Sequence, residues 1–304
     1  MTTQPTIGVF DSGFGGLTVL RALLPIIPSA RYFYLGDTAR LPYGSKSHET
    51  IARYAVSSAR FLLDQGAGLL VIACNTATAL ALEDIRAAAP PTIPVIGVIE
   101  PGAQAAASAC NVRLVPTEAQ INNAVILGEA KIPSISPLPP PTFAPQVLVL
   151  ATAATVQSHA YTHALAHLGI TATEKACPLL VPLVEEGWID HPVTREVARI
   201  YLSEALAEHP HLTTLLLGCT HYPLLRTILA ETLATLNRPL TIIDSAEATA
   251  QTVARYLDTP YLAPSATSAD CTFYATDSIE KFARLGSQFL GQPLPKVHLT
   301  DLDG

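Results

Sequence analysis

The sequence predicts an α/β protein built on parallel strands, and three observations support this fold class. Ala, Leu, Val and Ile dominate the 304 residues while aromatic residues make up only 6%, which suits helices packed on parallel strands. Short apolar runs alternate with stretches of helical periodicity. Two of these runs, at residues 69–73 and 215–217, end one and two residues before a cysteine, Cys74 and Cys219 respectively. Because ligands bind at the carboxyl ends of parallel strands, we expect both thiols at a ligand-binding edge.

Strands and helices alternate in the first 110 residues. Residues 6–10 form a strand, and the loop from Asp11 to Gly16 leads into a helix over residues 17–24, which Pro25 is expected to end. The loop glycines allow backbone N–H groups to approach an anionic ligand at the start of that helix. The elements expected next are strands at residues 31–35, 69–73 and 95–99, and helices at residues 49–65, 78–88 and about 102–109.

A second unit of the same kind begins with a strand at residues 146–150. Thr152 stands where the first unit has its glycine-rich loop, and it precedes Cys219 by 67 residues, much as Asp11 precedes Cys74 by 63. This matching distance indicates an internal duplication of one α/β half. The remaining expected elements are a helix from residue 156, a strand starting near residues 174–177, a connection at residues 178–187, a helix at residues 193–208, a strand at residues 242–245, a helix at residues 246–256 and a further segment at residues 273–290.

We therefore expect two pseudosymmetric open-sheet α/β domains with the functional site in the cleft between them. The chain is expected to return to its first domain near the end, so this domain comprises residues 1–98 and 245–304, and the second comprises residues 99–244. Six prolines crowd residues 133–145, which cannot be regular helix. Residues from about 111 to 146 are thus expected to form a partly irregular surface insertion in the second domain.

Charge and hydropathy exclude two classes of partner. The formal net charge is −7 and the 18 lysine and arginine residues are scattered singly, so no basic stripe exists to bind nucleic acid. No run of about 18 apolar residues could cross a membrane, and Asp11 stands where a signal peptide needs a basic region. The five cysteines are odd in number and lack CxxC spacing, which fits reduced thiols rather than disulfides or a zinc site. We expect a cytoplasmic protein without nucleic-acid or membrane partners.

Cys74 and Cys219 are the candidate catalytic groups. A lone cysteine in an apolar run is usually a small core residue, and Cys110, Cys177 and Cys271 are interpreted in that way. Polar residues follow Cys74 and Cys219 at once, and such residues suit a polar ligand better than a core. Two opposed thiols, one ionised and one protonated, can invert a carbon stereocentre by taking a proton from one face and returning one to the other.

Two further side chains are placed to assist these thiols. Asp11 can assist Cys74, and His221 can assist Cys219, which lies two residues before it. A structural aspartate in a turn and a surface histidine are the alternative interpretations of these two residues.

The sequence contains no convincing cofactor motif. The GxGG of residues 13–16 is not GxGxxG, no Walker lysine follows a glycine loop, and only five lysines exist for a Schiff base. His159, His163 and His167 repeat every four residues on one expected helix, but no coordinating cysteine or acid accompanies them on that face. We therefore expect neither an organic cofactor nor a metal.

Six motifs together resemble those of one enzyme family. They read IGVFDSGFGGLTVL (residues 7–20), YLGDTARLPYG (34–44), ACNTATA (73–79), GVIEPG (97–102), ACPLLVPLVEEG (176–187) and LGCTHYPLL (217–225). In this order, and with FYATDSIEKFARLGSQFLG at residues 273–291, they closely resemble the glutamate racemases of the aspartate/glutamate racemase superfamily. The resemblance covers nearly the whole chain. It implies a cofactor-independent, two-base racemase that interconverts L- and D-glutamate and supplies D-glutamate to bacterial peptidoglycan.

The resemblance also implies roles for individual residues. Cys74 would be the base for D-glutamate, assisted by Asp11. Cys219 would be the base for L-glutamate, assisted by His221 together with Glu185. Substrate contacts are implied for Ser12, Pro42, Tyr43, Gly44, Asn75, Thr76, Thr152, Thr155 and Thr220.

Several alternatives stay open at this point. The alignment of the VEEG motif favours Glu185 over Glu186 as the assisting carboxylate. A racemase for aspartate or another small acidic amino acid is the second reading, and a non-catalytic binding homologue is the third. We expect a homodimer. Members of the family dimerise in several ways, so the sequence does not predict which surface forms the interface. The proline-rich insertion stands where the family has a short connection, and ATAAT at residues 151–155 keeps both threonines of the usual loop.

Overall fold

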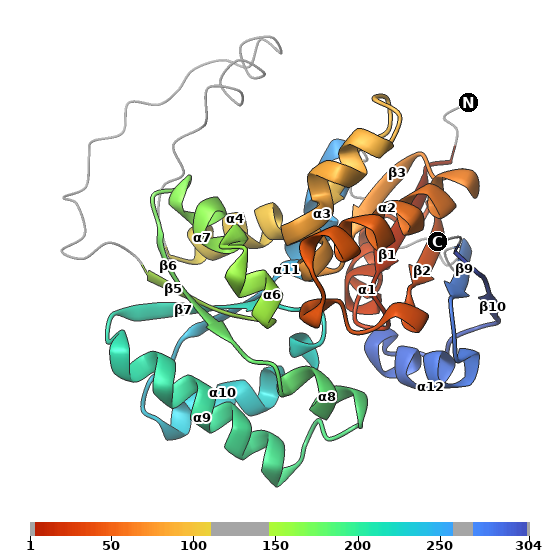
Figure 1. Ribbon diagram of the computed structural model, residues 1–304. Coiled ribbons are helices and arrows are strands. Elements are labelled where there is room, and N and C mark those ends of the chain that lie inside the picture. The colour runs from red at the N-terminus through yellow and green to blue at the C-terminus, as the bar shows by residue number, and fades with distance from the viewer. Residues whose placement is uncertain (1–3, 111–145, 258–269, 303–304) are drawn as a thin grey trace.

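Two parallel β-sheets, each covered by helices on both faces, make up the protein (Figure 1). The computed structural model describes residues 4–110, 146–257 and 270–302. In these ranges one sheet has six strands in the order β10-β9-β2-β1-β3-β4, and the other has four in the order β6-β5-β7-β8. The predicted α/β class is thereby confirmed. The expected proline-rich insertion lies, apart from Gln146, outside the described residues.

The larger sheet is formed by both ends of the chain. Its strands are β1 (Thr6–Asp11), β2 (Arg31–Gly36), β3 (Leu69–Ile72), β4 (Val95–Gly97), β9 (Asp270–Ala275) and β10 (Val297–Leu299). The helices that follow these strands or connect them are α1 (Leu17–Ile26), α2 (His48–Asp64), α3 (Asn75–Ala88), α4 (Ile99–Ala109), α11 (Ser245–Tyr256) and α12 (Ile279–Leu290), with short 3-10 turns at Thr38–Arg40 and Tyr43–Ser45.

The smaller sheet is formed by the middle of the chain. Its strands are β5 (Gln146–Ala151), β6 (Thr171–Ala176), β7 (Leu212–Gly218) and β8 (Thr241–Asp244). The helices of this part are α6 (Ala153–Gln157), α7 (Ala160–Ala166), α8 (Leu180–Glu185), α9 (Pro192–Glu208) and α10 (Arg226–Thr235), with a 3-10 turn at Tyr222–Leu225. None of the described helices is long and apolar enough to cross a membrane.

The strand order of the smaller sheet repeats that of four strands in the larger one. The run β2-β1-β3-β4 corresponds strand by strand to β6-β5-β7-β8, and all these pairs are parallel. β3 and β7 therefore occupy equivalent positions, each next to the first strand of its unit. This correspondence agrees with the internal duplication that the spacing of the two cysteines predicts.

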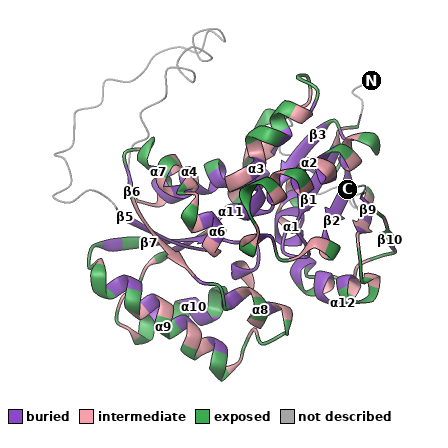
Figure 2. Ribbon diagram, in the orientation of Figure 1, coloured by how far each residue is buried: buried purple, intermediate pink, exposed green. Residues whose placement is uncertain are grey.

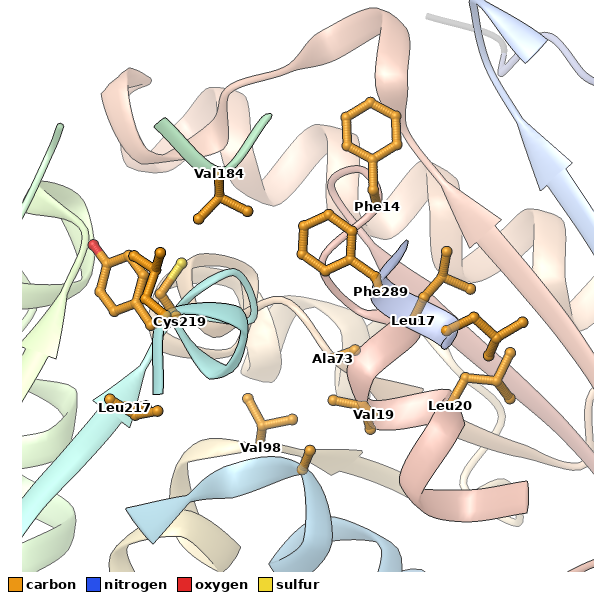
Figure 3. Close-up of a cluster of buried hydrophobic side chains, with 14 of the residues drawn as sticks. Phe14, Leu17, Val19, Leu20, Ala73, Val98, Val184, Leu217, Cys219 and Phe289 are labelled. Carbon is orange, nitrogen blue, oxygen red and sulfur yellow. The ribbon is translucent and has the colours of Figure 1, made fainter. Parts of the chain in front are cut away.

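The central strands of both sheets are buried on both faces, as their continuous apolar sequences require, whereas the edge strands β6 and β10 are more exposed (Figure 2). In β1, Ile7 packs toward α1, whereas Phe10 on the opposite face packs toward α2 and α3. One apolar cluster continues from the larger sheet to the smaller one. Figure 3 shows its members Phe14 and Phe289 beside α1, and its members Val184 and Cys219 across from them. The two halves thus share part of a core.

Several elements differ from the sequence prediction for identifiable reasons. α3 begins at Asn75, three residues early, because the sulfur of Cys74 accepts the N–H of Ala77 and caps the helix. α1 continues through Pro25 into its last turn instead of ending before it. The helix predicted from residue 156 is divided into α6 and α7 at His159, whose φ is 55°.

Four further elements were predicted incorrectly or missed. The predicted connection at residues 178–187 contains the short helix α8. β6 covers Thr171–Ala176 and so ends, instead of starting, near residues 174–177. α10 and β10 were not predicted, and β10 has only three residues to signal it.

Candidate active site

The two cysteines lie on the wall of one cavity of about 390 Å³ between the halves of the molecule. Cys74 follows β3 and caps α3, and Cys219 follows the equivalent strand β7. Both are nearly buried, with exposed fractions of 5% and 6%. The equivalence of the two strands, rather than any local feature of either cysteine, brings the two thiols to a common site.

Twelve of the fourteen residues singled out from the sequence line this cavity. They are Ser12, Pro42, Tyr43, Gly44, Cys74, Asn75, Thr76, Thr152, Glu185, Cys219, Thr220 and His221. The other two, Asp11 and Thr155, are fully buried behind the wall. The hydroxyl of Thr155 hydrogen-bonds those of Thr76 (3.3 Å) and Thr152 (2.9 Å), so it supports residues that do line the cavity.

The surroundings of Cys74 keep its proton in place. Its Sγ donates to Oγ of Ser12 at 3.5 Å and accepts the N–H of Ala77 at 3.4 Å. Burial raises the pKa of the Cys74 thiol to about 12, and the nearby charge of Asp11 acts in the same direction. The neutral thiol is therefore the resting form of Cys74.

Asp11 lies behind Cys74, between the two halves of the molecule. One carboxylate oxygen accepts the N–H of Gly13 at 2.9 Å, and the other accepts the hydroxyl of Thr220 at 3.5 Å. Complete burial raises the pKa of Asp11, although the charge of His221 and these hydrogen bonds oppose the rise. A carboxyl with a raised pKa beside a thiol is suited to exchanging a proton with it.

Cys219 lies at one end of a row of ionisable groups. Nδ1 of His221 is 4.0 Å from the sulfur of Cys219, and its Nε2 is 3.2 Å from Oε1 of Glu185. The other oxygen of Glu185 is 3.9 Å from Nζ of Lys281. Glu185 is thus the carboxylate that contacts His221, as the motif alignment favours, while Glu186 lines the cavity.

The protonation of this row follows from its contacts. Burial alone would lower the pKa of His221, but its bonds with Cys219 and Glu185 raise it to about 10. Burial would raise the pKa of Glu185, yet His221 and Lys281 outweigh that effect and lower it. An imidazolium held against a carboxylate is therefore the stable pair across neutral pH, and it places a transferable proton beside Cys219.

The rest of the cavity wall consists largely of neutral hydrogen-bonding groups. No lysine or arginine is found among the described residues that line it. Asn75 is held by the hydroxyl of Tyr161, which donates to its Oδ1 at 2.6 Å. The hydroxyls of Thr76 and Thr152 meet at 3.0 Å. Such a wall can bind carboxylates through N–H and O–H dipoles without a charged partner.

Tyr43 is fixed by a buried carboxylate that the sequence reasoning did not single out. Its hydroxyl donates to Oδ2 of Asp37 at 2.5 Å, while Thr276 from the end of β9 donates to Oδ1 at 3.0 Å. Beside it, Gly44 lies so close to Thr152 that a Cβ there would be 3.0 Å from the Cβ of that threonine. The segment around Tyr43 thus closes the cavity against the second unit.

Other contributors were also missed. Phe289 packs its ring edge-on against His221 with centroids 5.1 Å apart, and Lys281 contacts Glu185. Both lie on α12, far from the cysteines in sequence, within the stretch 273–291 that resembles the family. Asp37 lies within the motif YLGDTARLPYG, so all three residues belong to quoted stretches, but no local pattern in them indicated a role at the site.

Comparison with known proteins assigns this arrangement to a class. A family model described as Asp/Glu/Hydantoin racemase matches residues 17–136. The glutamate racemase of Koribacter versatilis is 47% identical over 324 residues, which covers 99% of each chain. The glutamate racemase of Syntrophus aciditrophicus is 41% identical and covers 97% of this chain and 96% of its own. The protein belongs to the glutamate racemase family.

Solved structures agree with this assignment. The glutamate racemase of Francisella tularensis, in complex with D-glutamate, has a TM-score of 0.78 at 31% identity and covers 100% of this chain and 99% of its own. That of Thermus thermophilus, in complex with β-chloro-D-alanine, has a TM-score of 0.75 at 37% identity with 98% of each chain covered. The aspartate racemase of Picrophilus torridus, at 17% identity and a TM-score of 0.51, shares the fold alone.

Proposed function

We propose that this protein interconverts L- and D-glutamate by a two-base mechanism that needs no cofactor. The observation that carries the proposal is the pair of thiols that line one cavity, one from each half of the molecule and each at the end of an equivalent strand. The full-length similarity to glutamate racemases, one of them in complex with D-glutamate, supports glutamate as the substrate. A pair of identical acid/base groups suits a reaction whose two directions are chemically alike.

In the proposed reaction each thiol serves one enantiomer. The thiolate of Cys74 takes the α-proton of D-glutamate, and the thiol of Cys219 returns a proton to the opposite face. For L-glutamate, Cys219 removes the proton and Cys74 donates one. Each turnover therefore moves one proton from one sulfur to the other, and exchange with water restores the starting form.

The neighbours of the thiols prepare them for these steps. Since the pKa of Cys74 is raised to about 12, it needs a partner to become a base, and Asp11 behind it is the group we assign. His221 exchanges its proton with Cys219, and Glu185 stabilises the imidazolium. General acid/base assistance of this kind typically contributes about 100-fold or more to a rate.

We infer that the carboxylates of glutamate bind to the neutral wall of the cavity. The donors we assign to them are Ser12, Asn75, Thr76, Thr152, Thr220 and the backbone N–H groups of Tyr43 and Gly44, next to which Pro42 lines the cavity. Thr155 acts behind Thr76 and Thr152. Binding by dipoles avoids a lysine or arginine whose charge would have to be desolvated at every binding of substrate and left without its partner at every release of product.

We further infer the setting in which the enzyme works. The mechanism needs reduced thiols, and all five cysteines are free, which favours the cytoplasm. The family resemblance implies that the D-glutamate is used for peptidoglycan and that the protein forms a homodimer.

The experiment that tests the mechanism is deuterium exchange. Incubation with L-glutamate in D2O, without pyridoxal phosphate, should give D-glutamate carrying deuterium at the α-carbon. Cys74→Ala and Cys219→Ala should each abolish racemisation, whereas Cys177→Ala, in a core cysteine, should retain it. Undiminished racemisation in either of the first two variants would contradict the two-thiol mechanism. The same assay with aspartate tests the alternative substrate.

A further inference from the structure

Asn75 has one buried hydrogen-bond donor without a partner. The residue is 3% exposed and lines the cavity, directly after Cys74. Its Oδ1 accepts the hydroxyl of Tyr161, but its Nδ2 has no hydrogen-bond partner among the described residues. A buried polar group normally has a hydrogen-bond partner. The unpaired N–H group of Asn75 therefore indicates that a ligand bound in the cavity supplies the acceptor.

Tyr161 holds the amide from the other half of the molecule. Its side chain is fully buried on α7, and its hydroxyl reaches Asn75 at the start of α3. The side chain of Ser245 hydrogen-bonds the same tyrosine oxygen. A Cβ at Gly218 would be 2.9 Å from the tyrosine ring, so a glycine there makes room for it. Packing and hydrogen bonds together fix this hydroxyl in place.

The direction of this hydrogen bond determines which end of the amide faces the substrate. With Tyr161 donating to Oδ1, the amide presents Nδ2, a donor, as its remaining group. If the amide were rotated by half a turn, it would present an oxygen to a carboxylate, and the two acceptors would repel each other. A reliable orientation is thus required for binding an anion without a lysine or arginine.

We propose that Tyr161 is a positioning residue that fixes the amide of Asn75, so that Nδ2 donates to a carboxylate oxygen of the substrate. The proposal deepens the proposed function and rests on it. Tyr161 acts only through Asn75 and does not itself line the cavity. Its contribution is therefore to substrate affinity in both directions rather than to proton transfer.

Kinetics of Tyr161→Phe test this role. Removing the hydroxyl without changing the ring should raise KM for both enantiomers by about tenfold, the effect of one good hydrogen bond, with a smaller change in kcat. In an Asn75→Ala background the same substitution should have little further effect on KM. Tyr32→Phe is the matched control, because Tyr32 is equally buried, donates to the carbonyl of Ile27 at 2.8 Å and does not line the cavity.

Each outcome decides between distinct possibilities. An unchanged KM in Tyr161→Phe, or an equal further loss in the Asn75→Ala background, would overturn the positioning role. Should Tyr161→Phe not fold, Asn75→Asp provides the test, because it keeps the acceptor for Tyr161 but presents an oxygen to the substrate. It should raise KM at least as much, and an unchanged KM would overturn the proposal. Failure of the wild-type protein to racemise glutamate would instead contradict the proposed function.

Discussion

The two thiols have chemically unequal partners. Cys74 has a buried carboxylate behind it and a serine hydroxyl beside it, while Cys219 has an imidazolium backed by a carboxylate. The strands that carry them are equivalent, so the difference arises in the few residues around each sulfur. For His221 this difference predicts a contribution to stability that depends on pH.

His221→Asn should lower the free energy of unfolding in a pH-dependent way. The pKa of His221 is raised from 6.5 to about 10 in the folded protein, so the histidine stabilises the fold fully below pH 6.5. That stabilisation is lost as the pH rises from 6.5 through about 10. Denaturant unfolding of both proteins across this window should therefore show a difference that is largest at low pH and shrinks at high pH. A difference independent of pH would contradict the raised pKa.

Sequence reasoning found the residues that lie in local motifs and missed those that act from a distance. Cys74 and Cys219 each follow a strand and precede polar residues, which is a signal that a single sequence can carry. Tyr161 and Lys281 have no such signal, because their roles depend on which element packs against which. A tyrosine on an amphipathic helix and a lysine on a C-terminal helix look like ordinary core and surface residues.

At the scale of elements, the turn after β1 supports the turn after β7. A methyl group on Gly15 would lie 2.7 Å from Nδ1 of His221 and would also meet Oγ1 of Thr220. Gly15→Ala should therefore displace the histidine and lower kcat by about 100-fold, as small misplacements in active sites do. Gly68→Ala is the control, since a Cβ there would approach nothing closer than 3.7 Å. Steady-state kinetics of the two variants should differ sharply; equal kcat values would show that the turn adjusts freely.

α12 should influence acid/base chemistry through one ion pair. Lys281 lies 3.9 Å from Glu185 and is one cause of the lowered pKa of that carboxyl. In Lys281→Met the pKa of Glu185 should rise. As the pH is lowered, Glu185 is then protonated at a higher pH than in the wild-type protein, and activity that needs its carboxylate is lost earlier. The acid limb of the kcat profile should move upward by a fraction of a pH unit. The exposed Lys296→Met should leave the profile unchanged, and an unmoved limb in Lys281→Met would exclude the coupling.

The elements themselves were predictable where their signals were long and simple. β3 and β7 are continuous apolar runs, and α2 and α9 have clear helical periodicity, so their bounds were predicted to within a few residues. α8 was missed because Pro182 and the glutamates at residues 185 and 186 are typical of a connection. The segment forms a helix that buries Leu180 and Val184 in the core. Packing of this kind is not recorded in the local sequence.

For the molecule as a whole, the cavity between the halves predicts stabilisation by substrate. Cys74→Ala should bind D-glutamate without converting it. At roughly a hundred times Kd, bound ligand should raise the free energy of unfolding by about 2.7 kcal/mol. Thermal unfolding should show the corresponding rise in Tm. D-Norvaline, which has the same chain without the side-chain carboxylate, should produce little shift; equal shifts with both ligands would contradict carboxylate recognition by the cavity wall.

The overall architecture followed from the duplicated pattern of the sequence. The two parallel sheets and the repeated strand order are confirmed. The division into residues 1–98 with 245–304, and residues 99–244, stays a prediction, which the pairing of β9 and β10 with the larger sheet supports. The shared apolar cluster was not foreseen, because a single sequence does not indicate how two similar halves pack.

The unequal partners of Cys74 and Cys219 have a consequence for the direction of flux. L- and D-glutamate are mirror images with identical free energies in water, so their equilibrium ratio is unity. The Haldane relation then requires kcat/KM to be the same in both directions, however different the surroundings of the two thiols are. The two directions can therefore differ in kcat only if they differ in KM by the same factor. Net production of D-glutamate must therefore be driven by whichever reaction consumes it.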